Sequence, residues 1–293
     1  MQAELVLDAR NTVGESPVWI AAEQALYWSD IPARRLYRWQ AVSGAVTDWA
    51  SPGMIGCFAP HASGGWLCAM EDGVHHLWTD DSGGLNGVLM AQAEHARPGM
   101  RFNDGRCDRQ GRFRAGTMLM DMGAAQAVGA FYSLERDHCV PLVDGLIVPN
   151  GLAFSPDGRT MYLSDSHPSV QRIWAFDYDT ATGRPANRRL FVDMTALPGR
   201  PDGAAVDEDG CYWICANDAG LVHRFTPEGR LDRSLALPVR KPAMCAFGGA
   251  QLDTLYVTSI RPGDADATGQ PLAGGVFALR PGVRGLPEPA FQS

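Results

Sequence analysis

Apolar residues along this chain occur in short stretches that are separated by glycine, proline and other turn-forming residues. Six of the stretches contain an aromatic residue and are followed, after a turn, by a second short apolar stretch. Such short runs favour strands, because a globular helix needs a longer segment with apolar residues every three to four positions. The pattern therefore predicts many short strands joined by turns. The aromatic markers of the six stretches are Tyr27, Trp66, Phe113, Tyr162, Tyr212 and Tyr256.

The spacing of the six markers is nearly regular. Successive markers are 39, 47, 49, 50 and 44 residues apart, close to the ~40–50 residues of one four-stranded propeller blade. Another apolar stretch ending in a turn lies ahead of each marker, as expected for the innermost strand of a blade. The sequence thus predicts an all-β fold, a six-bladed β-propeller of four-stranded blades that forms a single domain over residues 1–293. The apolar N-terminal segment ELVLDA would close the ring by completing the last sheet.

A common position at the start of the inner strands indicates where a site could lie. When these strands are aligned on their hydrophobic pattern, the residue just before each one would face the central channel at one end. Four of the six carry oxygen-bearing side chains, and two of these are carboxylates, which would repel each other without a cation between them. Such ligands suit Ca²⁺, Mg²⁺ or Mn²⁺, with Zn²⁺ as an alternative. The six residues are Glu15, Met54, Asn103, Asn150, Asp202 and Ala243.

A structural role competes with this interpretation at three of these positions. Asn103, Asn150 and Asp202 stand beside or close to a glycine, and Asn and Asp readily start tight turns. Glu15 escapes this explanation, because Glu is not a preferred turn residue. The coincidence of four polar residues at equivalent positions therefore favours a site over a set of turns.

Composition narrows the range of partners. The chain has 293 residues, 45% of them hydrophobic, and a formal net charge of −8 with scattered basic residues. It can bury a large core, and it would repel phosphate backbones and anionic lipid surfaces. Nucleic acids and membranes are thus not expected as partners. Since no basic start leads into an apolar segment and no apolar run reaches about 18 residues, we expect a cytoplasmic protein, a monomer or weak dimer.

Several common catalytic chemistries lack their key residues here. The sequence has no GxSxG nucleophile elbow, HExxH helix, P-loop or GxGxxG motif after a strand. Lys241 is the single lysine and leaves one possible position for Schiff-base chemistry. The seven cysteines lack tight spacing and are interpreted as buried thiols.

Several motifs resemble those of the SMP-30/gluconolactonase/regucalcin family. They follow the family's order across nearly the whole chain and include GESPVW, RFNDGRCDRQGRFRAGTM, VPNGLAFSPDGRTMYLSDS, RPDGAAVDEDGCYW and MCAFGGAQLDTLYVTS. The resemblance implies a six-bladed propeller with one divalent metal on its axis, bound by Glu15, Asn150 and Asp202. It also implies that Arg101 and Asn103 hold substrate hydroxyls or the ring oxygen. The metal could be Ca²⁺, Mg²⁺, Mn²⁺, Zn²⁺ or Fe²⁺.

One position departs from the family's pattern. Some relatives carry a substrate-contacting Glu after the AGTM motif, whereas this chain reads AGTMLMDM and has Asp121 as the nearest acidic residue in register. Asp withdraws the carboxylate by about 1.5 Å, one C–C bond, so the pocket could suit a different sugar. The structural alternatives are an exposed loop for Asp121 and a surface ion pair for Arg101.

The resulting hypothesis is a metal-dependent lactonase that hydrolyses a sugar (aldono-)lactone to the aldonic acid in bacterial sugar catabolism. The metal would polarise the lactone carbonyl while Asp202 acts as the catalytic base. Arg101, Asn103 and Asp121 would orient the sugar. Two alternatives stay open, a regucalcin-like calcium-binding regulatory protein and a hydrolase of organophosphates or other esters at the same metal site.

Overall fold

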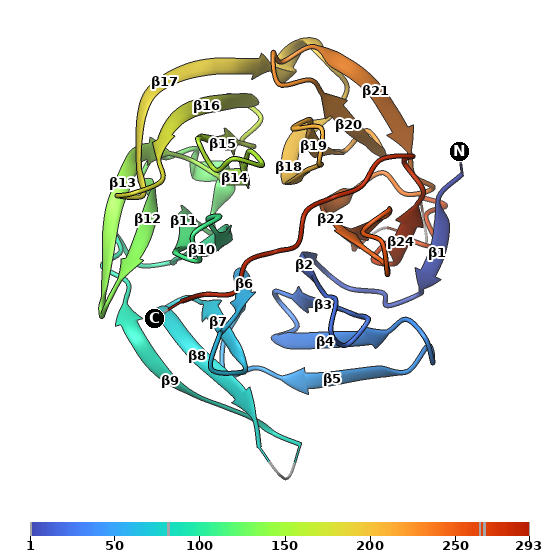
Figure 1. Cartoon of the computed structure of the whole chain (residues 1–293), viewed down its shortest axis with the longest axis horizontal. Coiled ribbons are helices and arrows are strands. Elements are labelled where there is room, and N and C mark those ends of the chain that lie inside the picture. The colour runs from blue at the N-terminus through green and yellow to red at the C-terminus, as the bar shows by residue number, and fades with distance from the viewer. Residues whose placement is uncertain (1, 81–82, 264, 266–267, 293) are drawn as a thin grey trace.

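Strands make up nearly all the regular structure of the chain. The structure is a computed structural model that describes residues 2–80, 83–263, 265 and 268–292. Over these residues it contains 24 strands and two single-turn 3₁₀ helices, η1 (Met122–Ala124) and η2 (Met194–Ala196). The sheets are arranged around a common centre (Figure 1). The predicted all-β fold is confirmed.

Three four-stranded antiparallel sheets follow the chain in simple order, each strand pairing with the next. Short turns between consecutive strands make this arrangement possible, because antiparallel neighbours need only a tight hairpin connection. The strands of these sheets are β2 (Gly14–Ile20), β3 (Ala25–Asp30), β4 (Arg35–Gln40) and β5 (Val46–Ala50); β14 (Pro149–Phe154), β15 (Thr160–Asp165), β16 (Arg172–Asp179) and β17 (Arg184–Asp193); and β18 (Arg200–Val206), β19 (Tyr212–Asn217), β20 (Leu221–Phe225) and β21 (Leu231–Ala236).

A fourth sheet has eight strands, in the order β10-β11-β12-β13-β9-β8-β7-β6. It consists of two antiparallel four-stranded units that meet in one parallel residue pair, His138 of β13 opposite Gln92 of β9. The units therefore repeat the pattern of the other sheets. Their strands are β6 (Cys57–Pro60), β7 (Trp66–Ala69), β8 (Gly73–Thr79) and β9 (Leu85–Gln92), then β10 (Met100–Cys107), β11 (Phe113–Leu119), β12 (Gly129–Glu135) and β13 (His138–Leu146).

The last sheet combines strands from both ends of the chain. Its order is β22 (Pro242–Gly248), β23 (Thr254–Ser259), β24 (Val276–Leu279) and β1 (Glu4–Leu7). The strand β1 pairs antiparallel with β24, and Glu4 lies opposite Ala278. The N-terminal segment ELVL thus occupies the outer edge of the sheet that the C-terminal strands form.

The first strand of each unit lies at the centre of the ring. Contacts between these strands run in a closed cycle, from β2 to β6, β10, β14, β18, β22 and back to β2. The six aromatic markers of the sequence all fall in the second strands, β3, β7, β11, β15, β19 and β23. The sequence repeat therefore corresponds to a structural repeat in which each unit starts at the channel and proceeds outward (Figure 1).

The hydrophobic core is divided among the interfaces between neighbouring units. Tyr27 of the first unit packs on Trp66 of the second, with ring centroids 4.3 Å apart. Trp19 of the first stacks on Tyr256 of the last at 5.4 Å. Truncating one large buried side chain of this kind to alanine costs about 3–5 kcal/mol. Each unit is therefore held by both of its neighbours, which keeps the inner strands at fixed positions around the channel.

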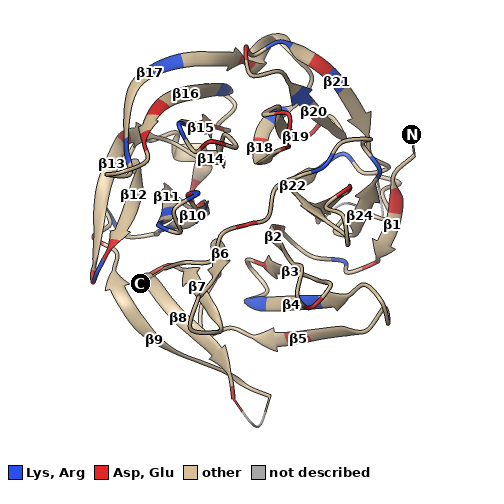
Figure 2. Ribbon diagram, viewed as in Figure 1, with Lys and Arg blue, Asp and Glu red and all other residues tan. Residues whose placement is uncertain are grey.

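Charged residues of both signs are scattered around the ring (Figure 2). Six of the seven cysteines are buried free thiols, as predicted, and Cys139 is partly exposed. None of the helices in the described part of the chain has the length and apolar character needed to cross a membrane.

Candidate metal and substrate site

Bulges in the inner strands mark the predicted axial positions. In five of the six units, the pairing of the inner strand with the second strand shifts register close to the predicted residue; β6 pairs with β7 without a shift. A bulge bends a strand and turns side chains in a new direction. Polar side chains can therefore project into the channel while the rest of the strand keeps its apolar pattern. The shifts fall between Glu15 and Val18, Phe102 and Gly105, Asn150 and Ala153, Pro201 and Ala204, and Pro242 and Cys245.

Two of the predicted metal ligands are in direct contact. The amide Nδ2 of Asn150 donates to Oδ1 of Asp202 at 2.8 Å and to Oγ of Ser166 at 3.1 Å. The other carboxylate oxygen of Asp202 accepts from Nδ2 of Asn217 at 2.6 Å. These bonds fix the orientation of both side chains. Within the described residues, the Oδ1 atom of Asn150 accepts no hydrogen bond and keeps its lone pairs for another partner.

The third predicted ligand, Glu15, shares the electrostatic environment of Asp202. Burial, followed by repulsion from Asp202 and Asp104, raises the pKa of Glu15 well above its ordinary value. Burial likewise raises the pKa of Asp202 to about 7, although the nearby Arg200 opposes the shift. The ionised forms of these carboxylates are thus disfavoured in the protein alone.

This arrangement fits a hard divalent cation. A cation between Glu15 and Asp202 would stabilise both ionised carboxylates and would relieve their mutual repulsion. The free amide oxygen of Asn150 adds a neutral ligand of the type that Ca²⁺, Mg²⁺ and Mn²⁺ accept. No group of three or more His, Cys, Asp and Glu side chains suited to a metal occurs among the described residues. The candidate set is of another kind, two carboxylates and one amide.

Arg101 and Asn103 lie beside these residues. Nη1 of Arg101 donates to Oδ1 of Asn103 at 2.9 Å, and Nδ2 of Asn103 donates to the carbonyl of Pro149, next to Asn150, at 3.0 Å. The charge of Arg101 also acts on the carboxylate of Glu15. Arg101 is therefore directed toward the channel, and the alternative of a surface ion pair for this residue is wrong.

Asp121 occupies a different position. It is exposed and precedes η1 in the connection between β11 and β12, and its side chain makes no capping hydrogen bond. The carbonyl of the next residue, Met122, lies 3.2 Å from Nε2 of His167, which follows Ser166 in the chain. The loop thus reaches residues that adjoin Asn150, but Asp121 itself is not among the buried channel residues. Its contact with substrate stays a prediction.

The sequence interpretation missed a third carboxylate in the channel. Asp104 is buried, and burial raises its pKa. Its Oδ2 accepts from the backbone nitrogen of Leu152 at 2.8 Å, whereas its Oδ1 is buried without a partner. The alignment of inner strands assigned one channel residue to each strand, but the bulge of β10 turns both Asn103 and Asp104 inward. The adjacent Asn-Asp pair in RFNDG was the available signal.

Comparison with known proteins agrees with this architecture. A family model described as the SMP-30/gluconolactonase/LRE-like region matches residues 13–261. The chain belongs to this family. It is 39% identical to a 6-deoxy-6-sulfogluconolactonase of Pseudomonas putida (96% of this chain, 95% of the relative) and 36% identical to a regucalcin of Danio rerio (98% and 97%). A crystal structure of a calcium-binding protein, regucalcin, from Agrobacterium tumefaciens matches with a TM-score of 0.91 and 29% identity over 100% of this chain and 98% of that one.

Membership of the family confirms two predictions. The family is the one that the sequence motifs resembled, and the class of enzyme, a lactonase, is supported by the same membership. The coverage extends over nearly the full length of the chain and of these relatives. The inner strands and their bulges therefore all lie within the matched region.

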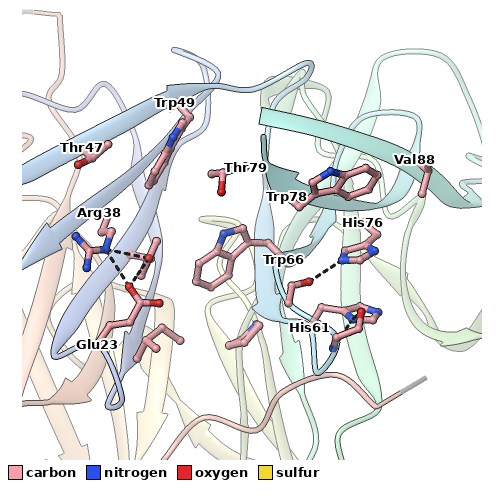
Figure 3. Close-up of a pocket in the computed structure, with 16 residues that line it drawn as sticks. Glu23, Arg38, Thr47, Trp49, His61, Trp66, His76, Trp78, Thr79 and Val88 are labelled. Atoms are coloured by element: carbon pink, nitrogen blue, oxygen red, sulfur yellow. Dashed lines mark hydrogen bonds and ion pairs between the residues drawn. The ribbon is translucent and has the colours of Figure 1, made fainter. Parts of the chain in front are cut away.

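A separate groove lies between the first two units. Its volume is about 1050 Å³, and aromatic side chains that include Trp49, Trp66 and Trp78 line it (Figure 3). An ion pair between Glu23 and Arg38, 3.0 Å apart, stands at one side. None of the residues predicted for the family's site lines this groove. The cavity and the charged axial site are therefore distinct.

Proposed function

We propose that this protein hydrolyses a sugar lactone to the corresponding aldonic acid at the axial site, with one divalent cation held by Glu15, Asn150 and Asp202. The observation that carries the proposal is the arrangement at the bulges of the inner strands, where the interacting carboxylates of Glu15 and Asp202 occur together with a free amide oxygen of Asn150. The Pseudomonas relative, a 6-deoxy-6-sulfogluconolactonase, supports a sugar lactone as the substrate class. The Agrobacterium relative, a calcium-binding protein, supports Ca²⁺ as the cation.

The cation would polarise the lactone carbonyl. Asp202 would take the proton of the attacking water, because its two oxygens are held in a fixed orientation by Asn150 and Asn217. Water would add its oxygen to the carbonyl carbon, and the bond between that carbon and the ring oxygen would break. The ring oxygen would leave as a hydroxyl by taking up a proton, which balances the proton given to Asp202.

Arg101 and Asn103 would orient the sugar. The hydrogen bond between them holds both side chains in place beside the ligands, and the guanidinium has further donors for hydroxyl groups or the ring oxygen. Asp121 would contact the sugar from the loop at the rim.

The proposal also includes the number of blades, the closure of the ring and the extent of the domain. The six units would form a six-bladed propeller closed by β1, in a single domain over residues 1–293. The closed cycle of inner strands and the pairing of β1 with β24 support it. The enzyme would act on sugars in bacterial catabolism, in the cytoplasm, as a monomer or weak dimer.

Turnover of lactones by metal-stripped protein tests the proposal. Proton release is followed with gluconolactone, galactonolactone, arabinolactone and xylonolactone before and after addition of Ca²⁺, Mn²⁺, Mg²⁺ or Zn²⁺. We expect at least one lactone to be hydrolysed with added cation and the activity to disappear with chelator. Absence of turnover with every pair of lactone and cation would refute the proposal.

A calcium-binding protein without lactonase activity is the second candidate, favoured by the regucalcin relatives. Calorimetry separates the two. Binding of Ca²⁺ with no turnover of any lactone would select the second candidate, whereas binding with turnover supports the first.

A further inference from the structure

The C-terminal segment, residues 280–292, crosses the ring at the end of the channel opposite the candidate site (Figure 1). It hydrogen-bonds to turns that connect the first and second strands of four different units. Of the candidate ligands, Asp202 lies near the start of one of those first strands, β18, away from its turn, and Glu15 and Asn150 lie at the corresponding ends of β2 and β14. The bonds are Glu208 N to Arg284 O (2.8 Å), Gly285 N to Leu252 O (2.8 Å), Phe291 N to Pro60 O (2.7 Å) and Gln292 N to Gly111 O (2.9 Å).

This segment carries Glu288 to the channel. Oε1 of Glu288 accepts from Nη1 of Arg106 at 3.1 Å, across 182 positions of sequence. Both side chains are largely buried, with exposed fractions of 9% for Arg106 and 19% for Glu288. A buried pair contributes little to stability relative to well-packed apolar residues. A contribution to stability therefore does not explain why this ion pair lies at the channel.

Arg106 connects the pair to the candidate site. It lies on β10, two residues beyond Asp104, and successive side chains of a strand alternate in direction, so both are directed to the same side. Arg106 is the group that most strongly favours the ionised form of Asp104. Asp104 in turn acts on Glu15 and Asp202. Charges of alternating sign thus follow the channel from Glu288 to the candidate ligands.

We propose that Glu288 is a positioning residue for the cation site, which it serves by pairing with Arg106 and offsetting the charge of this arginine close to Asp104. The inference rests on the proposed function, because it needs a cation at the axial site. It adds a role for the C-terminal segment that the position of Glu288 in the sequence gives no reason to expect.

The expected effect on the cation follows from the charges. When Glu288 is neutral, the net charge of the channel rises by one, and the charge of Arg106 is no longer offset by Glu288. The negative potential at Glu15 and Asp202 therefore falls, and a divalent cation binds less tightly. Substitution of residues that orient metal ligands from outside the first coordination sphere commonly costs 10–100-fold in affinity. We expect about tenfold here, at the lower end, because Glu288 acts through two other residues.

Calorimetric titration of CaCl₂ into metal-free protein tests the proposal. Glu288→Gln keeps the shape of the side chain and an oxygen that can accept from Arg106, but removes the charge. Its dissociation constant for Ca²⁺ should rise about tenfold, whereas Glu288→Asp, which keeps the charge, should stay nearer the wild-type value. Glu135→Gln is the matched control, since Glu135 forms an exposed ion pair with Arg184 at 2.8 Å on an outer strand. It should leave calcium affinity unchanged.

The melting temperature of each metal-free variant separates a positioning role from a purely structural one. Equal losses of stability in Glu288→Gln and Glu288→Asp, with calcium affinities within twofold of wild type, would overturn the proposal and leave the lactonase function intact. A wild-type protein that hydrolyses no lactone but shows the tenfold difference in calcium affinity would refute the proposed reaction while supporting the role of Glu288. A wild-type protein that binds none of Ca²⁺, Mn²⁺, Mg²⁺ and Zn²⁺ would refute both.

Discussion

Hydrogen bonds hold both carboxylate oxygens of Asp202. Each of its carboxylate oxygens accepts from an asparagine amide, one from Asn150 and one from Asn217. These donors favour the ionised form, whereas burial favours the protonated form and is the stronger influence, since the pKa of Asp202 is about 7. The side chain is therefore held in a fixed orientation, and burial disfavours its ionised form when no cation is bound.

The substitution Asp202→Asn should abolish most lactone hydrolysis. Asparagine keeps the size of the side chain but cannot take a proton, and general-base assistance contributes about 10²–10⁴-fold to rates. We expect kcat with saturating cation to fall at least about a hundredfold. Asp177→Asn serves as the control, because Asp177 pairs with Arg189 on an exposed strand. A variant at position 202 with more than half of wild-type kcat would remove Asp202 from the mechanism.

Metal-free protein should become less stable as pH rises from about 4 to about 7. The folded-state pKa of Asp202 is raised above its ordinary value of 3.8 to about 7, so in this range the folded chain binds more protons than the unfolded chain. The contribution of this group is fully present below about pH 4 and is lost as pH rises through 7. Glu15, whose pKa is also raised, acts in the same direction.

Calorimetric melting in the presence of chelator measures this effect. The comparison of wild type with Asp202→Asn isolates it, because the asparagine cannot titrate. The variant should gain stability relative to wild type as pH rises, and added Ca²⁺ should reverse the order at pH 8. A difference between the two proteins that does not change with pH would contradict the expectation.

Asp121 should influence which lactone the enzyme prefers. Asp121→Glu extends the carboxylate by about 1.5 Å, and a hydrogen bond gained or lost at a sugar hydroxyl contributes about 0.5–1.5 kcal/mol, up to about 3 when charged. The ratio of kcat/KM for pentono- and hexono-lactones should therefore change roughly 3- to 100-fold, with calcium affinity unaffected. Ratios within about twofold, typical of an exposed surface change, would place Asp121 outside the site.

At the scale of strands, the sequence indicated most of what the structure shows. Aromatic markers and turn residues predicted the second strands, and the hydrophobic alignment predicted the channel positions of Asn150 and Asp202. The alignment could not predict Asp104, because a bulge that turns two successive residues inward leaves no trace in an alternating pattern. Nor could it predict the pairing of Glu288 with Arg106, since the sequence holds no local signal for a contact across 182 positions.

Removal of β1 should destabilise the last sheet. The strand pairs with β24, and Val6 and Leu7 pack against the core shared by the first and last units. Loss of this apolar burial and of the pairing should cost roughly 2–4 kcal/mol. The melting temperature of a chain that starts at Asp8 should therefore fall by roughly 5–15 °C. A chain that starts at Ala3 provides the control and should melt like wild type.

At the scale of the whole molecule, every unit buries its apolar faces against two neighbours, and four units contribute polar side chains to one channel. The cation site and the ring consequently depend on each other. A cation bound as proposed would hold three of the units at their inner strands, while the C-terminal segment connects four units at the opposite end. The two ends of the channel would thus be fixed by different means, one ionic and one by backbone hydrogen bonds.

The pairing of β1 with β24 also affects how the chain can be made. During synthesis β1 leaves the ribosome before the other strands of its sheet, and its partner β24 follows about 270 residues later. At roughly 5–20 residues per second, this interval lasts about 15–50 s. Throughout it the first units can fold in order while the N-terminal strand has no edge to join. Its short length of four residues limits the edge that it offers to other nascent chains, and its sheet is complete only after β24 has been made.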